Sequence, residues 1–200
     1  MAITASPYGL RPINRVDGMP YAGATDTFLI DPAGEATNIF YGQVVIIGAD
    51  GYLAISTADG SDITTNNLGG NGVGAVGVFV GCEYVNAQGQ VINAQYYPSG
   101  TTGVVTAKVI TDPNVAFQAQ LDGSGAQTVL GTNTFFAAVQ STSTGSTQTG
   151  NSTSALDATV QTTAAAFRIV GFVSPAGDAF TDVLVKFNPS AHSYTNNVGL

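Results

Sequence analysis

Short runs of β-branched and aromatic residues, separated by glycine, proline, asparagine and aspartate, recur along the chain after residue 26. Such runs are typical of β-strands bounded by turns. No window of a dozen residues carries a convincing apolar stripe at helical spacing with caps. The nearest is 155–166, whose threonine, aspartate and valine content leaves at most one short helix there. The chain is therefore predicted to be all-β.

Nine or ten strands are predicted from these runs. After a first strand from Thr27 that ends at Asp31-Pro32, the runs cover 43–47, 52–55, 76–85, 91–97, 104–110, 129–141, 165–173 and 182–187. Glycines in 48–51 and 86–89 suit tight hairpins, because glycine readily adopts a positive φ. A turn at 112–114 leads into a further run, in which Val115, Phe117 and Ala119 are predicted to face inward and Ala116, Gln118 and Gln120 outward. This pattern favours a sandwich or a jelly-roll-like barrel.

Residues 1–26 differ from the rest of the chain. They contain three prolines and three glycines without a period of 2 or 3.6, which indicates an extended N-terminal arm. The arm is too apolar for a solvated tail, so we expect it to lie against another surface. Residues 27–200 are predicted to form a single β-rich domain. Within it, 141–154 contains only Ser, Thr, Gly, Gln and Asn, and is expected to be an exposed loop.

Charged residues are few, and acidic residues outnumber basic ones. Only 9% of residues are charged, against about 25% in an ordinary soluble domain, and five cations face thirteen acids for a net charge of −8. Binding to nucleic acid needs clustered Lys and Arg that release counterions, so this composition excludes it. The same sign argues against docking on an anionic membrane, and no window approaches 18 uninterrupted apolar residues.

The residues that carry chemistry are few and scattered. Gly72-Val-Gly74-Ala-Val-Gly77 has the spacing of a dinucleotide fingerprint, but a β-branched run follows it where the fingerprint needs a helix. His192 has no partner at metal-ligand or triad spacing and is predicted to lie on the surface. Most aspartates adjoin Gly or Pro, where a turn role explains them. The single Cys82 is predicted to be a buried, inert thiol. We expect no enzyme activity, no cofactor and no metal.

The start of the chain lacks a charged region followed by an apolar one, so no secretory signal is expected and synthesis in a cytoplasm is predicted. Low charge with abundant Thr, Ser, Asn, Gln and Gly is nevertheless more usual in proteins that act outside cells. A virion component, made inside a cell and used outside it, satisfies both expectations.

Several stretches together resemble one family, the capsid decoration or cement proteins of tailed bacteriophages. The resemblance spans most of the chain, and its most recognisable marks are Tyr8-Gly9-Leu10-Arg11-Pro12, Tyr21-x-Gly23 and Asp112-Pro113-x-x-x-Phe117-x-x-Gln120. The stretches that carry it are SPYGLRPINRVDGMPYAGATDTFLI, YGQVVIIGADGYL, VGVFVGCEYVNAQGQVINAQYYPSG, ITDPNVAFQAQ, FRIVGFV and VLVKFNPSAH. Segment 141–154 does not match the pattern.

The resemblance implies a structural protein on the outer surface of the virion. Such a protein binds the major capsid protein, bridges neighbouring subunits, strengthens the head and associates with itself as a dimer or trimer. The expected capsid-binding residues lie in the arm: Tyr8, Leu10, Arg11, Pro12, Ile13, Arg15 and Tyr21. Arg11 and Arg15 are candidates for pairing with acids of a partner. The alternative is a head- or tail-surface module that recognises host glycans, for which Tyr84, Tyr96 and Tyr97 are candidate stacking residues.

Overall fold

The computed structural model of the protein describes residues 4–65, 67–69, 72–142 and 145–199. Two short 3₁₀ helices, Gln127–Val129 and Pro189–Ala191, are the helical elements of this part of the chain. Its eleven strands are β1 (Arg11–Arg15), β2 (Asp26–Ile30), β3 (Val44–Ile47), β4 (Leu53–Ile55), β5 (Gly77–Val85), β6 (Val91–Ala94), β7 (Val105–Ile110), β8 (Val115–Gln120), β9 (Asn133–Thr134), β10 (Phe167–Phe172) and β11 (Asp182–Phe187).

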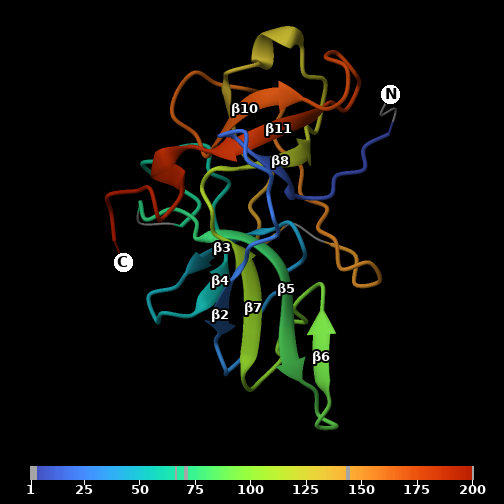
Figure 1. Ribbon diagram of the computed structural model, residues 1–200, viewed down its shortest axis with the longest axis vertical. Helices are drawn as coiled ribbons and strands as arrows, with labels where there is room; N and C mark the ends of the chain where they lie inside the picture. Colours follow the sequence, from blue (N-terminus) through green and yellow to red (C-terminus); the bar gives the residue numbers. More distant parts are fainter. Residues whose placement is uncertain (1–3, 66, 70–71, 143–144, 200) are drawn as a thin grey trace.

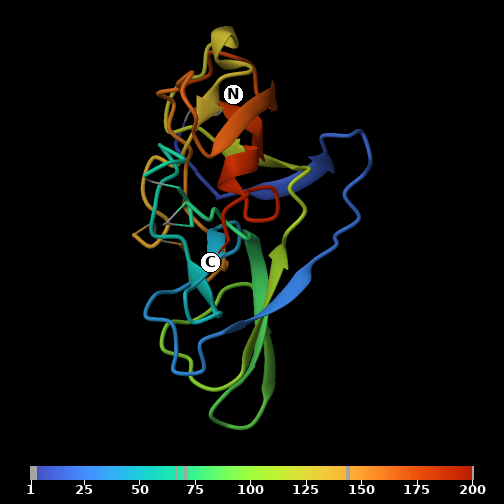
Figure 2. The same cartoon turned by 90° about the vertical axis from the view of Figure 1, so that its left-hand side faces the viewer.

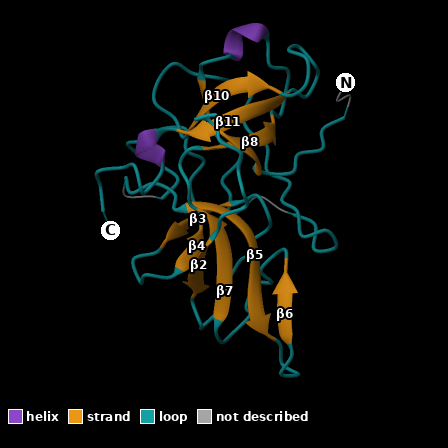
Figure 3. Cartoon of the chain, in the orientation of Figure 1, coloured by secondary structure: helices purple, strands orange, loops and turns teal. Residues whose placement is uncertain are grey.

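The strands form two sheets, which lie one above the other along the long axis in Figure 1. The five-stranded sheet has the order β1-β8-β11-β10-β9, and its pairs are antiparallel. The six-stranded sheet has the order β3-β4-β2-β7-β5-β6, and an additional antiparallel pairing joins β3 to β5. This pairing closes β3, β4, β2, β7 and β5 into a ring and leaves β6 as an edge strand (Figure 3).

Two apolar clusters form the core. One is built on the ring and contains Phe79, Tyr97 and Val109 among others, all fully buried. The other lies between the sheets, because Val44, Val78 and Ile110 of the six-stranded sheet belong to the same cluster as the inward side chains of β8, β10 and β11. Burial of large apolar side chains on this scale supplies the main driving force for folding, about 1.5–3 kcal/mol for each.

The prediction of an all-β fold is confirmed, with eleven strands in the described residues where nine or ten were expected for the chain. The hairpins at 48–51 and 86–89 are confirmed too, joining β3 to β4 and β5 to β6, with Gly51 and Gly89 at φ of 82° and 78°. The expected strand at 129–141 was wrong: 133–134 alone is a strand, paired with β10. Residues 155–166 form no helix.

The turn at Asp112-Pro113-Asn114 joins two sheets. β7 before it belongs to the six-stranded sheet, whereas β8 after it pairs with β1 and β11 of the five-stranded sheet. The predicted inward face of β8 is confirmed, since Val115, Phe117 and Ala119 are at most 1% exposed. Ala116 and Gln120 were expected on the opposite, outward face, yet they are only 5% and 3% exposed; β8 lies inside the sheet, flanked by β1 and β11.

The surface position expected for His192 was wrong. Its side chain is 1% exposed and lies edge-on to Phe187, with 5.3 Å between ring centroids. Nδ1 accepts a hydrogen bond from the backbone N–H of Tyr194 at 3.2 Å. Burial lowers the pKa of His192 to about 4, because the imidazolium form loses its hydration; Asp112 acts in the opposite direction but more weakly.

The buried imidazole makes stability depend on pH. Between the unfolded pKa of 6.5 and the folded pKa of about 4, the unfolded chain binds a proton that the folded chain does not, so stability falls as pH falls through this window. We expect the native protein to lose up to about 3 kcal/mol more free energy of unfolding than His192→Phe between pH 7 and pH 4. Denaturant titrations of both proteins at each pH measure this difference. Parallel curves would show that His192 does not contribute.

Candidate functional site

The N-terminal segment crosses the segment around Gly42 and is hydrogen-bonded to it, with Gly9 packed directly against Gly42. Gly9 donates its N–H to Ser154 O at 3.0 Å, and Leu10 donates to Gly42 O at 2.9 Å. A Cβ on Gly9 would lie 2.7 Å from Gly42 O, and Gly9 and Gly42 have φ of 74° and 86°. Both positions therefore need glycine, for close approach and for the left-handed backbone. The crossing places Leu10 fully inside the core between the sheets.

Residues that follow the crossing form β1, which the sequence did not predict. β1 pairs with β8 in antiparallel register, from Arg11 opposite Gln118 to Arg15 opposite Val115, with an irregularity between Pro12 and Asn14. Part of the predicted arm is thus a strand of the protein's own sheet. Residues 1–3 of the predicted arm lie outside the described residues.

The seven predicted capsid-binding residues lie in different environments. Leu10 is in the core, Pro12 and Tyr21 are half-buried, and Ile13 is 44% exposed. Arg15 is paired within the chain, 2.9 Å from Asp17 Oδ2 and 3.1 Å from Asp112 Oδ2. The hydroxyl of Tyr21 donates to Ala24 O at 2.9 Å. The structure therefore does not bring the seven together as one surface.

Tyr8 and Arg11 stand at the wall of a polar cleft. The Tyr8 hydroxyl donates to Asp182 Oδ1 at 2.9 Å, and the Arg11 guanidinium lies 4.3 Å from the Tyr8 ring centroid. Burial raises the pKa of Tyr8 well above its usual value, and the bond to Asp182 adds to the effect. The tyrosine therefore stays protonated and remains a donor. The cleft has a volume of about 440 Å³ and is lined by Ser6, Pro7, Tyr8, Arg11, Gln120, Ser146, Thr149, Asn151, Ser152, Thr153 and Asp182.

Residues of the predicted Ser/Thr-rich loop also line this cleft. Thr147, Gln148 and Thr149 are exposed as expected, and 143–144 lie outside the described residues. The expectation of exposure was wrong for Ser152 and Ser154, which are 1% and 3% exposed. Their hydroxyls are 2.7 Å apart and hydrogen-bonded, and Ser154 Oγ also donates to Gln140 Oε1 at 3.3 Å. Polar side chains are buried at low cost when they bond to one another.

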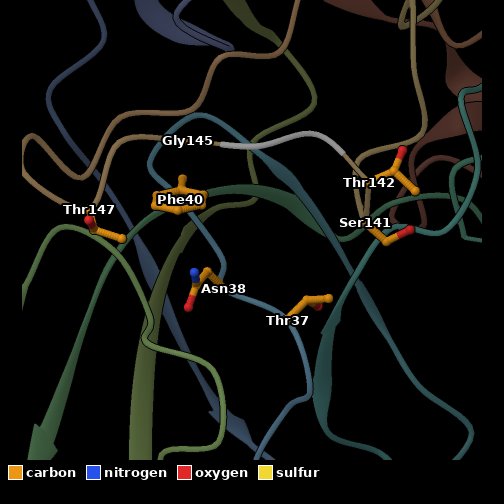
Figure 4. Close-up of a pocket in the computed structure, with 7 residues that line it drawn as sticks. All are labelled: Thr37, Asn38, Phe40, Ser141, Thr142, Gly145 and Thr147. Carbon is orange, nitrogen blue, oxygen red and sulfur yellow. The ribbon is translucent and has the colours of Figure 1, made fainter.

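A smaller hollow of about 210 Å³ lies on another side of the same loop (Figure 4). Threonine, serine and asparagine side chains surround the ring of Phe40, which is 4% exposed and stacks on Tyr96 with centroids 5.5 Å apart. Gly145 packs directly on this ring, where a Cβ would clash. The ring is thus part of the packing that holds the loop. The lining of the hollow is Thr37, Asn38, Phe40, Ser141, Thr142, Gly145 and Thr147.

A third feature is a projecting loop, residues 16–25, between β1 and β2. Figure 2 shows it standing away from the body. All its residues except Tyr21 are exposed, and it begins beside an exposed part of β1. Val16 is 45% exposed and Met19 is 59% exposed. We call residues 13–19, which carry Ile13, Val16 and Met19, the apolar rim.

Other sequence candidates have structural roles. Cys82 is 2% exposed, and burial raises the pKa of its thiol to about 12, which agrees with the predicted inert thiol. The glycine motif at 72–77 leads into β5, as predicted, rather than into a helix. Tyr97 is fully buried, with its hydroxyl donating to Thr101 O at 3.0 Å, so it is not available for stacking on a sugar. Within the described residues no group of three or more His, Cys, Asp or Glu is placed to hold a metal.

Comparison of the chain with models of protein families, with curated proteins and with solved structures gave no match. None of the helices in the described part of the chain has the length and apolar character needed to cross a membrane.

The Tyr8–Asp182 bond couples the N-terminal segment to β11, so its loss should destabilise the fold. Hydrogen bonds to charged groups contribute about 1.5–3 kcal/mol when buried. Because this one is half-exposed, we expect Tyr8→Phe to lower the free energy of unfolding by about 1 kcal/mol. Tyr194→Phe, at a ring 57% exposed, is the matched control and should change stability by less than about 0.5 kcal/mol. Equal effects of the two substitutions in urea titrations would contradict the assignment.

Proposed function

We propose that the protein is a structural virion component that binds the outer surface of a tailed-phage head and stabilises contacts between subunits of the major capsid protein. The resemblance described above suggests this role. The observation that carries it is the apolar rim, which exposes Ile13, Val16 and Met19 on a segment that projects from the body. The proposal includes no catalysis and no cofactor.

The rim is held at both ends, which favours tight docking. On one side β1 pairs with β8 and Leu10 is buried in the core; on the other, β2 pairs with β7. Arg15, Asp17 and Asp112 form an ion-paired group at the base of the loop. A segment ordered before binding loses little conformational entropy when it docks. Each large apolar side chain then contributes about 1.5–3 kcal/mol when it is fully buried against the partner.

The chemistry of the docking partner follows from what the rim offers. The partner surface is apolar where it meets Ile13, Val16 and Met19. Arg15 forms ion pairs with Asp17 and Asp112 of the same chain. The proposal therefore does not require Arg15 to pair with acids of a partner. A shell repeats the same site many times, and contacts made by linked copies reinforce one another through avidity. In this proposal the protein is made in the host cytoplasm and acts on the virion as a dimer or trimer.

A charge placed on the rim tests the proposal. Deleting the whole arm is a poor test, because it removes Leu10 and β1 from the fold. We expect Val16→Asp together with Met19→Asp to reduce occupancy on purified heads at least tenfold, since desolvating two carboxylates opposes docking. Val173→Asp, at another exposed valine (49%), is the control and should bind normally. Densitometry of sedimented heads measures occupancy; full occupancy by the double variant would refute docking through the rim.

A second candidate function, recognition of host glycans, is favoured by the polar cleft. Its walls carry hydroxyl and amide groups beside the Asp182 carboxylate, the kind of groups that bind sugars by hydrogen bonds. If this function holds, the purified protein binds glycans on an array and Asn151→Ala weakens the binding at least tenfold. The copy number in particles separates the two functions: hundreds of copies per head mean a decoration protein, and a handful mean a receptor-binding component.

A further inference from the structure

Edge strands of a sheet expose unpaired backbone groups, and the protein covers two of its edges. The β1 edge carries the returning chain, with Asn14 bridged to Pro20 and Arg15 N–H donating to Met19 O at 3.2 Å. At the β9 edge, Asn133 and Gln161 exchange two backbone hydrogen bonds of 2.9 Å. The ring of the six-stranded sheet has no edge of its own. β6 is thus the strand whose outer edge no described segment covers, and it stands at the margin of the molecule in Figure 3.

The backbone groups on this edge can be assigned from the hairpin. Asn86 N–H donates to Gln90 O at 2.9 Å, and the register runs from Val85 opposite Val91 to Cys82 opposite Ala94. Hydrogen-bonded and non-hydrogen-bonded pairs alternate along an antiparallel ladder. Ile92 is therefore in a hydrogen-bonded pair with Tyr84. The N–H and C=O of Val91 and Asn93 point away from β5, toward the open edge.

The edge lacks three of the devices that usually protect an edge strand from pairing, which are charged residues, proline and a bulge. β6 is short, at four residues, and its ladder with β5 has no irregularity. No Asp, Glu, Lys or Arg occurs between Glu83 and Lys108, and β6 contains no proline. In a chain of net charge −8, this stretch is a place where two copies approach without like charges meeting.

The outer face beside the edge is apolar as well. Val91 is 62% exposed and lies opposite Val85, which is 53% exposed. The β5–β7 register ends at Tyr84 opposite Val105, and Val104, the residue just before β7, is 70% exposed. Val85, Val91 and Val104 are thus exposed apolar residues at the same end of the sheet as the free edge.

We propose that a second copy of the chain pairs with β6 through its own β6, antiparallel and about a two-fold axis at Ile92. In this register Val91 and Asn93 of one copy exchange hydrogen bonds with Asn93 and Val91 of the other, so both copies present the same groups. The two six-stranded sheets then become continuous. The pairing identifies the surface that joins two copies, and it is independent of capsid binding, so isolated protein suffices to test it.

Proline at position 93 is the direct test. Because the Asn93 N–H points away from β5, Asn93→Pro leaves the β5–β6 ladder intact but removes one interchain donor from each copy and places a ring on the edge. Asn93→Ala is the matched control, which keeps the backbone donor. In sedimentation equilibrium up to millimolar protein, we expect a dimer for the native chain, an unchanged dissociation constant within threefold for the alanine variant, and at least a tenfold weaker dimer for the proline variant. A native monomer at all concentrations, or a proline variant that dimerises normally, overturns the proposal.

Cross-linking tests the register and does not depend on the proline variant folding. Ile92 would meet its own counterpart in a non-hydrogen-bonded pair, where opposite Cα atoms lie about 4.5 Å apart and the side chains approach most closely, within reach of a disulfide. We expect Ile92→Cys to form a disulfide-linked dimer under mild oxidation. Ala87→Cys, exposed at the hairpin tip and far from the axis, should stay largely monomeric. Absence of the Ile92→Cys dimer, or equal cross-linking of both variants, overturns the proposed pairing.

Discussion

The architecture depends on the pairing of β3 with β5. This pairing closes five strands into a ring, so that Phe79, Tyr97 and Val109 are enclosed in a core of their own. A closed ring has no free edges. The one strand of the six-stranded sheet outside the ring is β6, which pairs with β5 through their hairpin. Ring closure therefore determines both where the first core lies and which edge of the molecule stays open.

A second core exists because the chain leaves the ring at β7 and enters the other sheet at β8. Asp112 and Pro113 set the turn, and Asp112 also binds Arg15, so the turn is tied to the base of the projecting loop. Phe117 then contacts Phe187 of β11 edge-on, with centroids 5.8 Å apart. The same short connection thus orients both the core between the sheets and the segment that we propose to meet the capsid.

Local patterns predicted most strands of both sheets. Alternation and glycine turns identified β2 to β7 and the alternating run of β8, and the runs at 165–173 and 182–187 match β10 and β11. β1 was missed because its sequence, with Pro12 inside it, has no alternation and its partner β8 lies about a hundred residues away. Segment 129–141 was overread as a strand because its apolar residues pack as irregular chain: Phe136, for example, donates its N–H to Asp59 O rather than to a strand. Long-range pairing is not encoded in a window of ten residues.

The N-terminal segment also could not be predicted from local sequence alone. An apolar residue in an irregular N-terminal segment can enter its own core or meet a partner, and composition does not distinguish the two. Gly9 and Gly42 allow Leu10 to enter the core, because only glycine at both positions lets the two segments cross so closely. Beyond the crossing, the backbone turns outward, and Ile13, Val16 and Met19 stay exposed. The projecting loop and β6 point in different directions (Figures 1 and 2). One copy can therefore use the loop for a capsid subunit and β6 for a second copy at once, and a pair joined in this way would hold two docking loops in a fixed relation.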